Sequence, residues 1–291
     1  MTTATLRSAR GFDLGVAKAW PLWLGFAALA LPTLFTLAQQ SWPREDGAHG
    51  PIILAAGGWL LARELPQLRE RAAPAPLWLA LGLMVPALAA YVFGRAFDLL
   101  TLQVGGLYGA GLAILLAKFG PKALLGVWFP VFYLTFAIPP PGELMSSMTT
   151  PLKHFVSFVV SGGLGALGLP VAREGVTLIV AQYQLLVEDA CSGMNSLFGL
   201  TAISLLYVYL RRGSSLAYSL VLCAFITPVA VAANVIRVAI LVLLTYFFGD
   251  AVAQSFLHVT AGLLLFVTAL SLVFAIDQGL ERLWPKISAR S

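Results

Sequence analysis

The chain is 291 residues long, and its composition excludes a water-soluble globular domain. Hydrophobic residues make up 59% and charged residues 11% of the sequence, and the mean hydropathy is +0.87, values typical of a polytopic membrane protein. The net charge is +5, but the basic residues lie in short loops between apolar runs, where they set membrane orientation. We therefore expect no nucleic-acid binding.

Long apolar runs separated by short charged loops predict about eight membrane-spanning helices, and hence an all-α fold. Arg7, Arg10 and Lys18 precede the first run, which is too long for the core of a cleavable signal and is interpreted as a signal-anchor. The predicted spans are 20–40, 51–65, 77–94, 99–117, 123–138, 192–210, 216–233 and 257–276.

The distribution of lysine and arginine predicts how these spans are oriented. With the N-terminus in the cytoplasm, 13 of the 18 basic residues lie in inner segments, as the positive-inside rule requires. The five outer ones are Arg44, Arg95, Lys153, Arg173 and Arg237. The opposite orientation would invert this ratio, so both chain ends are expected inside.

Residues 152–169 are apolar enough to span the membrane, but a span here would place Cys191 inside and Arg211 and Arg212 outside. We therefore expect an interfacial or re-entrant helix on the outer face. Residues 171–189 are rich in Val, Ile, Leu and Tyr. This composition predicts a short β-hairpin outside the membrane that leads into Cys191.

The apolar stretch 216–248 determines where Arg237 lies. A helix that leaves the cytoplasm at Leu216 travels ~32 Å by Arg237, about one hydrocarbon core thickness. Residues 238–248 are then expected to fold back or to lie along the outer surface, because the next span begins near His258 and ends inside. Cys191, Arg237 and His258 would therefore converge on the outer face.

Cys191 lies in the stretch 190–197 (ACSGMNSL), at the start of an apolar helix. The partial positive charge of a helix N-terminus favours a thiolate, and the free backbone amides of Gly193 and Met194 could receive an oxyanion. The alternative interpretation of Cys191 is a small interfacial residue. The cysteine, together with a histidine and an arginine on the same face, predicts thiol acyl-transfer chemistry.

Two further ionisable residues, His258 and Arg237, interrupt apolar sequence. A histidine at a helix start is commonly a solvated cap, but ionisable residues inside membrane segments mark functional sites, and an arginine there is costly without a partner. Glu188 and Asp189 precede Cys191 and would raise the pKa of its thiol. They either bind a basic partner or orient His258.

Other conspicuous residues receive structural interpretations. His49 and His154 are expected at the interfacial surface, and Cys223 is expected to be a small buried hydrophobe that cannot reach Cys191. The pattern G-x-G-x-x-G at 163–168 lacks the preceding strand that a nucleotide site requires. The pattern G-x-x-x-G at 105–109 predicts close helix packing, and no zinc-ligand spacing occurs.

With these residues in view, the chain resembles the exosortase/archaeosortase family of membrane-embedded cysteine transpeptidase-like enzymes. The resemblance lies in Asp189–Gly193 (DACSG), in Pro228 through Asn234-Val235-Ile236-Arg237, in His258, and in Trp42 with His49-Gly50-Pro51 of the first outer loop. It implies a catalytic triad of Cys191, Arg237 and His258. Asn195, one turn below Cys191, stands where many family members carry a basic residue, so substrate preference could differ.

The resemblance implies processing of exported proteins that carry a Pro-Glu-Pro-like motif, a hydrophobic helix and a basic tail. Cys191 would attack the scissile carbonyl to form a thioester, His258 would transfer protons, and Arg237 would hold the thiolate or oxyanion or pair with the motif's glutamate. Substrate contacts would come from Glu188, Asp189, Asn195 and Asn234.

The same resemblance implies a single integral domain over residues 1–291, with N-terminal helices in 1–150 and the catalytic part in 151–291. No cofactor or metal is expected. The partners would be the sorting signal and the lipid bilayer, and the site would face the periplasm from the bacterial inner membrane. The alternative function is a non-enzymatic transport or scaffold component of an exopolysaccharide export system, in which Arg237 and His258 line a polar pathway.

Overall fold

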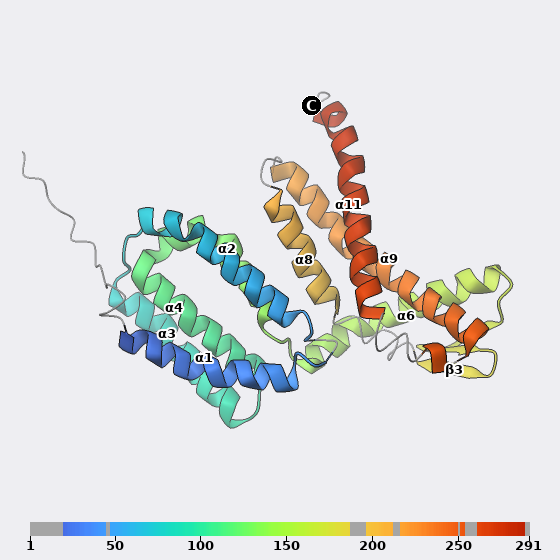
Figure 1. Ribbon diagram of the computed structural model, residues 1–291, viewed down its shortest axis with the longest axis horizontal. Helices are drawn as coiled ribbons and strands as arrows, with labels where there is room; N and C mark the ends of the chain where they lie inside the picture. The colour runs from blue at the N-terminus through green and yellow to red at the C-terminus, as the bar shows by residue number, and fades with distance from the viewer. Residues whose placement is uncertain are drawn as a thin grey trace, which may run out of the picture. The chain divides into compact units, whose positions relative to one another are not determined.

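The computed structural model describes residues 20–44, 47–186, 196–211, 216–249, 251–253 and 261–288, and these residues are mostly helical (Figure 1). They divide into two compact units. Unit 1 comprises Met1–Gln40 and Ala56–Ile138, and unit 2 comprises Ser41–Ala55 and Pro139–Ser291. Each unit is described by itself below.

Unit 1 is built from helices that follow the predicted apolar runs. They are α1 (Trp20–Gln40), the greater part of α2 (Gly50–Glu70), α3 (Leu77–Ala96), α4 (Leu100–Gly126), α5 (Trp128–Leu134) and the 3₁₀ turn η1 (Thr135–Ala137). The span predicted at 123–138 is not confirmed. The helical segment that follows the kink at Gly120 (φ 79°, ψ 168°) ends at Gly126, and the chain breaks again at Val127 (φ −118°, ψ 35°) before the short α5.

Helices α3 and α4 pack closely because glycine lets their backbones approach. A Cβ built on Gly106 would lie 2.5 Å from the backbone nitrogen of Tyr91, and one on Gly94 would lie 2.3 Å from the nitrogen of Gln103. Gly109 also faces α3, whereas a Cβ on Gly105 would meet nothing within 4 Å. The predicted close packing is therefore present, but the pair that makes it is Gly106 and Gly109.

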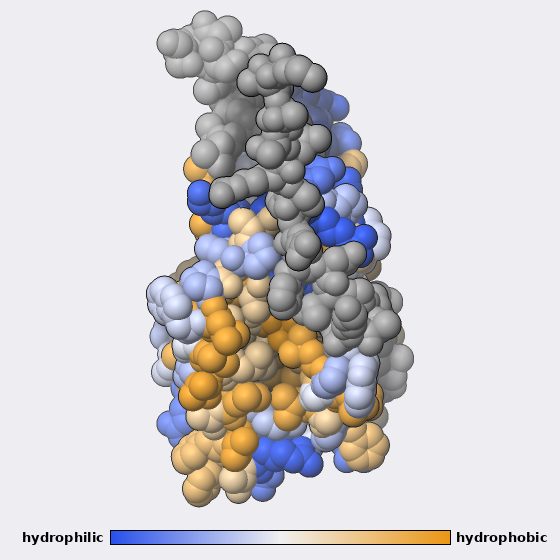
Figure 2. All heavy atoms as spheres, turned by 90° about the vertical axis from the view of Figure 1, so that its left-hand side faces the viewer, coloured by the Kyte–Doolittle hydropathy of each residue, from blue (hydrophilic) through white to orange (hydrophobic). Residues whose placement is uncertain are grey.

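A neutral hydrogen-bond network joins α1, α3 and α4. Gln103 Nε2 donates to Thr33 Oγ1 at 3.1 Å, and the Tyr91 hydroxyl donates to the Leu29 carbonyl at 3.0 Å. Thr33, Tyr91 and Gln103 are all buried. The side chains around them are apolar and many on the outside are exposed, and Figure 2 shows such apolar residues gathered over the middle of the visible face. Such an exposed apolar surface is typical of contact with lipid.

Besides the start of α2, the described residues of unit 2 form a small sheet and several helices. The helices are α6 (Gly142–Ala166), α8 (Ser196–Leu210), α9 (Leu216–Phe248) and α11 (Ala261–Ser288). Strands β1 (Val171–Glu174), β2 (Thr177–Val180) and β3 (Tyr183–Leu186) form an antiparallel sheet in the order β1-β2-β3. The predicted β-hairpin is present and gains a third strand through a second turn at Ala181, whose φ is 53°.

In the part of the chain that the structure describes, four helical segments are long and apolar enough to cross a membrane by length and composition: α1, α3, α4 and Tyr218–Phe248 of α9. Two shorter apolar helices cover Trp128–Ala137 and Phe198–Leu210. Among the described residues the prediction of eight spans is therefore not confirmed. The physical reasons are visible in α8, which has only 15 residues, and in α2, which carries Arg63, Glu64, Arg69 and Glu70 in its second half.

Helix α9 is one continuous element of 33 residues, so the chain does not fold back after Arg237. Val238, Leu241 and Val242 of its second half share a buried cluster with Val156 and Val160 of α6 and with Leu178 of the sheet. Helix α6 includes the segment 152–169 up to Ala166 and lies against α9 and the sheet. Its predicted interfacial or re-entrant position stays a prediction.

Candidate active site

Helix α9 carries two of the predicted site residues on one face. Asn234 and Arg237 are three residues apart, so their side chains lie one above the other along the helix. The exposed fraction is 0% for Asn234 and 1% for Arg237, which is among the largest fully buried side chains of the described residues. The Asn234 amide and the Arg237 guanidinium are therefore enclosed within the protein on a mostly apolar helix.

Arg237 lies between two hydrophobic clusters. One turn before it, Ala230 and Ala233 pack with Leu200 of α8 and with Ala269 and Val273 of α11. Directly after it, Val238 begins the cluster shared with α6 and the sheet. Burial of a guanidinium among apolar groups costs several kcal/mol per ion, and intramembrane ionisable residues are functional candidates for this reason.

A charged cluster joins one end of α8, α9 and α11. Asp277 of α11 has an exposed fraction of 0% and accepts hydrogen bonds from the Tyr207 hydroxyl at 2.6 Å and the Tyr218 hydroxyl at 2.5 Å. Arg211 forms ion pairs with Asp277 and with Glu281. We call these five residues the Asp277 clamp. It connects the end of α8, the start of α9 and the second half of α11.

The clamp keeps Asp277 ionised. Burial acts to raise the pKa of the Asp277 carboxyl, but the hydrogen bonds from Tyr207, Tyr218 and Arg211 together outweigh it and hold that pKa below its ordinary value. The pKa of Arg211 is raised, first by its hydrogen bond to Glu281. Both partners of the Arg211–Asp277 pair are therefore charged at neutral pH.

The clamp gives a common reference level from which positions along α8, α9 and α11 can be compared. At 1.5 Å per residue, Arg237 is roughly 28 Å from Tyr218 along α9, Ala261 is roughly 24 Å from Asp277 along α11, and Ser196 is roughly 22 Å from Arg211 along α8. The contact of Leu200 with Ala233 and Ala269 agrees with this register. Arg237 thus lies near the level at which α8 and α11 begin.

His49 packs against the first turns of α8. The sequence interpretation did not predict this contact. The exposed fraction of His49 is 7%, so the expected position at the interfacial surface is wrong. A Cβ built on Gly199 would lie 2.7 Å from His49 Cβ, so only glycine permits this approach. A Cβ on Gly50 would likewise lie 2.8 Å from Trp42 Nε1. His154, in contrast, is exposed as expected.

The comparison with protein families identifies the chain. A family model described as transmembrane exosortase matches residues 38–275, well over half of the sequence. The chain belongs to the transmembrane exosortase family. Neither the curated proteins nor the solved structures gave a significant match. Family membership makes the protein a membrane sorting enzyme in general terms.

Several predicted residues of this exosortase lie outside the described residues. They are Glu188, Asp189, Cys191, Gly193, Met194, Asn195 and His258. Cys191 precedes the start of α8 by five residues and His258 precedes the start of α11 by three. Cys223 is partly buried beside Tyr218 and Leu222 in α9. In the part of the chain that the structure describes, no three His, Cys, Asp or Glu side chains are grouped to hold a metal ion.

Proposed function

We propose that this exosortase is a cysteine transpeptidase or protease that cleaves a C-terminal sorting signal from exported proteins. The signal would consist of a Pro-Glu-Pro-like motif, a hydrophobic helix and a basic tail. The reaction would take place at the periplasmic side of the bacterial inner membrane. The burial of Arg237 and Asn234 on α9, near the level where α8 and α11 begin, carries this proposal.

In the first step the Cys191 thiolate attacks the carbonyl carbon of the scissile peptide bond. The carbonyl electrons move to oxygen, and the oxyanion is held by the Arg237 guanidinium and by the backbone amides of Gly193 and Met194. Collapse breaks the C–N bond, the leaving amine takes a proton from the His258 imidazolium, and a thioester remains on Cys191. No cofactor is needed for this step.

In the second step water or an amine attacks the thioester carbonyl. His258 removes the proton from this nucleophile, the C–S bond breaks, and the Cys191 thiolate is restored. A free carboxylate or a new amide is the product. Asn234, buried one turn from Arg237, is suited to orient the guanidinium or the motif because its amide both donates and accepts hydrogen bonds. Glu188, Asp189 and Asn195 would contact the remainder of the signal.

The proposal is tested by co-expression with a reporter that ends in such a signal. Wild-type enzyme should shorten the reporter, as measured by intact mass, whereas Cys191→Ala should leave it intact and Cys191→Ser should be nearly inactive. Cys223→Ala is the matched control and should process normally. Wild-type processing by Cys191→Ala would rule out the nucleophile and favour a non-enzymatic transport or scaffold role.

A further inference from the structure

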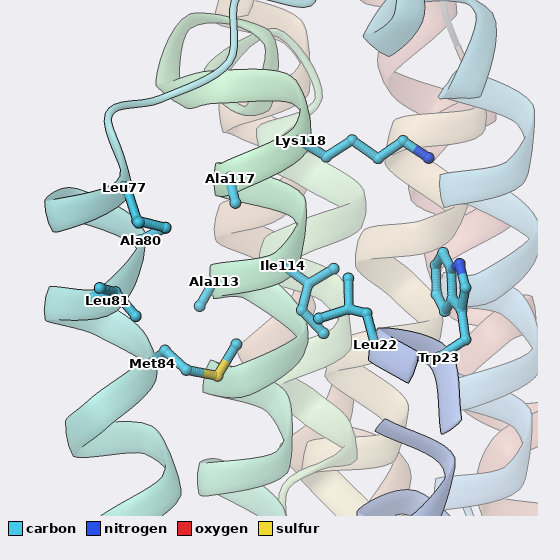
Figure 3. A pocket seen from close by; sticks show the side chains of 10 residues that line it. All are labelled: Leu22, Trp23, Leu77, Ala80, Leu81, Met84, Ala113, Ile114, Ala117 and Lys118. Carbon is cyan, nitrogen blue, oxygen red and sulfur yellow. The ribbon is translucent and has the colours of Figure 1, made fainter. Parts of the chain in front are cut away.

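Unit 1 has an apolar groove that the proposed chemistry does not use. It is a hollow of about 240 Å³ between the first turns of α1 and α3 and the second half of α4 (Figure 3). The side chains that line it include Leu22, Trp23, Leu81, Met84, Ile114 and Lys118. All but the lysine present carbon or sulfur surface, apart from the indole nitrogen of Trp23, so the groove favours a hydrocarbon ligand.

One end of the groove is basic and carries tryptophan. In Figure 3 the Lys118 side chain extends past Ile114 toward the side of the groove on which Trp23 lies. Lys118 is exposed, and its ammonium lies 5.5 Å from the Phe119 ring centroid. Trp20 and Trp78, in the first turns of α1 and α3, are also exposed. Tryptophan and lysine at helix ends mark the level of the lipid headgroups.

The lining of the groove indicates what can occupy it. Its walls are apolar, and Lys118 is the one charged side chain among the residues that line it. A single flexible hydrocarbon chain fits, and the ammonium of Lys118 at its end complements a negative headgroup.

We propose that this groove binds one acyl chain of an anionic phospholipid, with the lipid phosphate held by Lys118. The chain lies along Leu81, Met84 and Ile114, and the headgroup lies at the level of Trp23. The lipid would bridge α1, α3 and α4 near the ends of α1 and α3, where the Thr33–Tyr91–Gln103 network does not reach. This inference is independent of the cysteine chemistry.

The headgroup contact is tested by native mass spectrometry of the full chain in detergent, titrated with phosphatidylglycerol or phosphatidylcholine of identical acyl chains. Wild type should retain the anionic lipid about fivefold more tightly, the ratio that one basic residue near an anionic surface gives. Lys118→Gln should abolish this preference, whereas Lys122→Gln, also exposed on α4 but not lining the groove, should keep it. Equal retention of both lipids by wild type, or equal losses in the two variants, would overturn the headgroup site.

The acyl-chain contact is tested with two variants, one that reduces the volume of the groove and one that enlarges it. Ala117→Phe fills the groove and Leu81→Ala removes part of its wall, so each should lower retention of both lipids several-fold. Leu125→Phe, on an exposed position of α4 away from the groove, is the control and should bind as wild type. Size-exclusion chromatography checks folding. Unchanged retention by Leu81→Ala would overturn the groove as the binding site, whether or not Ala117→Phe folds.

Discussion

The two units hold their helices together by different means. In unit 1, α3 and α4 approach at the backbone through Gly94, Gly106 and Gly109, and the buried polar side chains there are neutral. In unit 2, α8, α9 and α11 are joined by the charged Asp277 clamp, and α9 carries a buried arginine.

Both means of joining helices suit a protein in an apolar solvent. The hydrophobic effect does not drive helices together in lipid, so close packing at small residues and interhelical hydrogen bonds stabilise their association. The contact between α3 and α4 of unit 1 uses these means, although α2 of the same unit buries Glu64, whose exposed fraction is 2%. Unit 2 buries Arg237 and Asp277 despite the desolvation cost of a charge, and buried ionisable residues of membrane proteins are candidates for functional sites.

The largest effect is expected from breaking the backbone contact of unit 1. Gly106→Leu would drive a side chain into Tyr91 and Ala87 of α3, where even a Cβ would lie 2.5 Å from backbone. We expect loss of folded protein, measured by size-exclusion chromatography in detergent. Gly105→Leu is the matched control, since a Cβ there meets nothing within 4 Å. Equal damage from both variants would contradict the assigned packing face.

The next effect concerns the buried cation of unit 2. Arg237→Lys keeps the charge but loses the planar fork of donors. Loss of one transition-state donor costs about 10²–10³ in rate, or about 3–4 kcal/mol. Processing measured by reporter mass should fall by that amount while the protein remains folded. Arg173→Lys, at an exposed position of β1, should be silent. Near-wild-type processing by Arg237→Lys would contradict a catalytic role for Arg237 and would indicate that the residue only anchors α9 at the membrane interface.

A smaller effect, on stability and not directly on chemistry, is expected from the clamp. Asp277→Asn leaves the Tyr207 and Tyr218 hydroxyls with one good acceptor in place of two, at a cost of about 1–3 kcal/mol. Thermal unfolding should therefore occur at a lower temperature in the variant at neutral pH. Glu281→Gln, at the exposed side of Arg211, should change the unfolding temperature much less.

The Asp277→Asn variant should also differ from wild type in how its stability responds to acid. Because the folded-state pKa of Asp277 is lowered, the clamp's contribution is complete above the ordinary Asp pKa of about 3.9 and is lost as the pH falls through the lower folded value. The difference in unfolding temperature between wild type and Asp277→Asn should be constant from about pH 7 to 5 and shrink below about pH 4. A difference that grows on acidification would contradict this assignment.

The smallest effect is expected at His49. Its ring is buried against Gly199 of α8, so His49→Ala should disturb the first turns of that helix. We expect kcat/KM for signal cleavage to fall about tenfold, equivalent to about 1.4 kcal/mol. His154→Ala is the control because His154 is exposed. Unchanged activity in both variants would assign His49 to packing alone.

The sequence predicted those features that depend on local pattern. Apolar runs located most helices, and β-branched residues located the sheet at 171–186. The sequence could not predict which face of α4 packs against α3. Gly106 and Gly109 lie on that face and Gly105 does not, but the three glycines look alike in the sequence.

Features that depend on distant partners were missed. His49 is buried by Gly199, far along the chain, and Asp277 is held by side chains of α8 and α9. No local pattern marks such pairs. Arg237 was found because a charge inside an apolar run is conspicuous by itself.

The length of α9 has a consequence for which substrates the enzyme can accept. A helix of 33 residues is roughly 50 Å long, whereas the hydrocarbon core is about 30 Å thick. Val238, Leu241 and Val242 in the second half of α9 are buried against α6 and the sheet, and an upright helix of this length extends beyond the hydrocarbon core. For the proposed reaction, such an extension would fix the height above the membrane at which the peptide bond is cut. The number of residues between the motif and the hydrophobic helix of the signal would then be part of what the enzyme recognises.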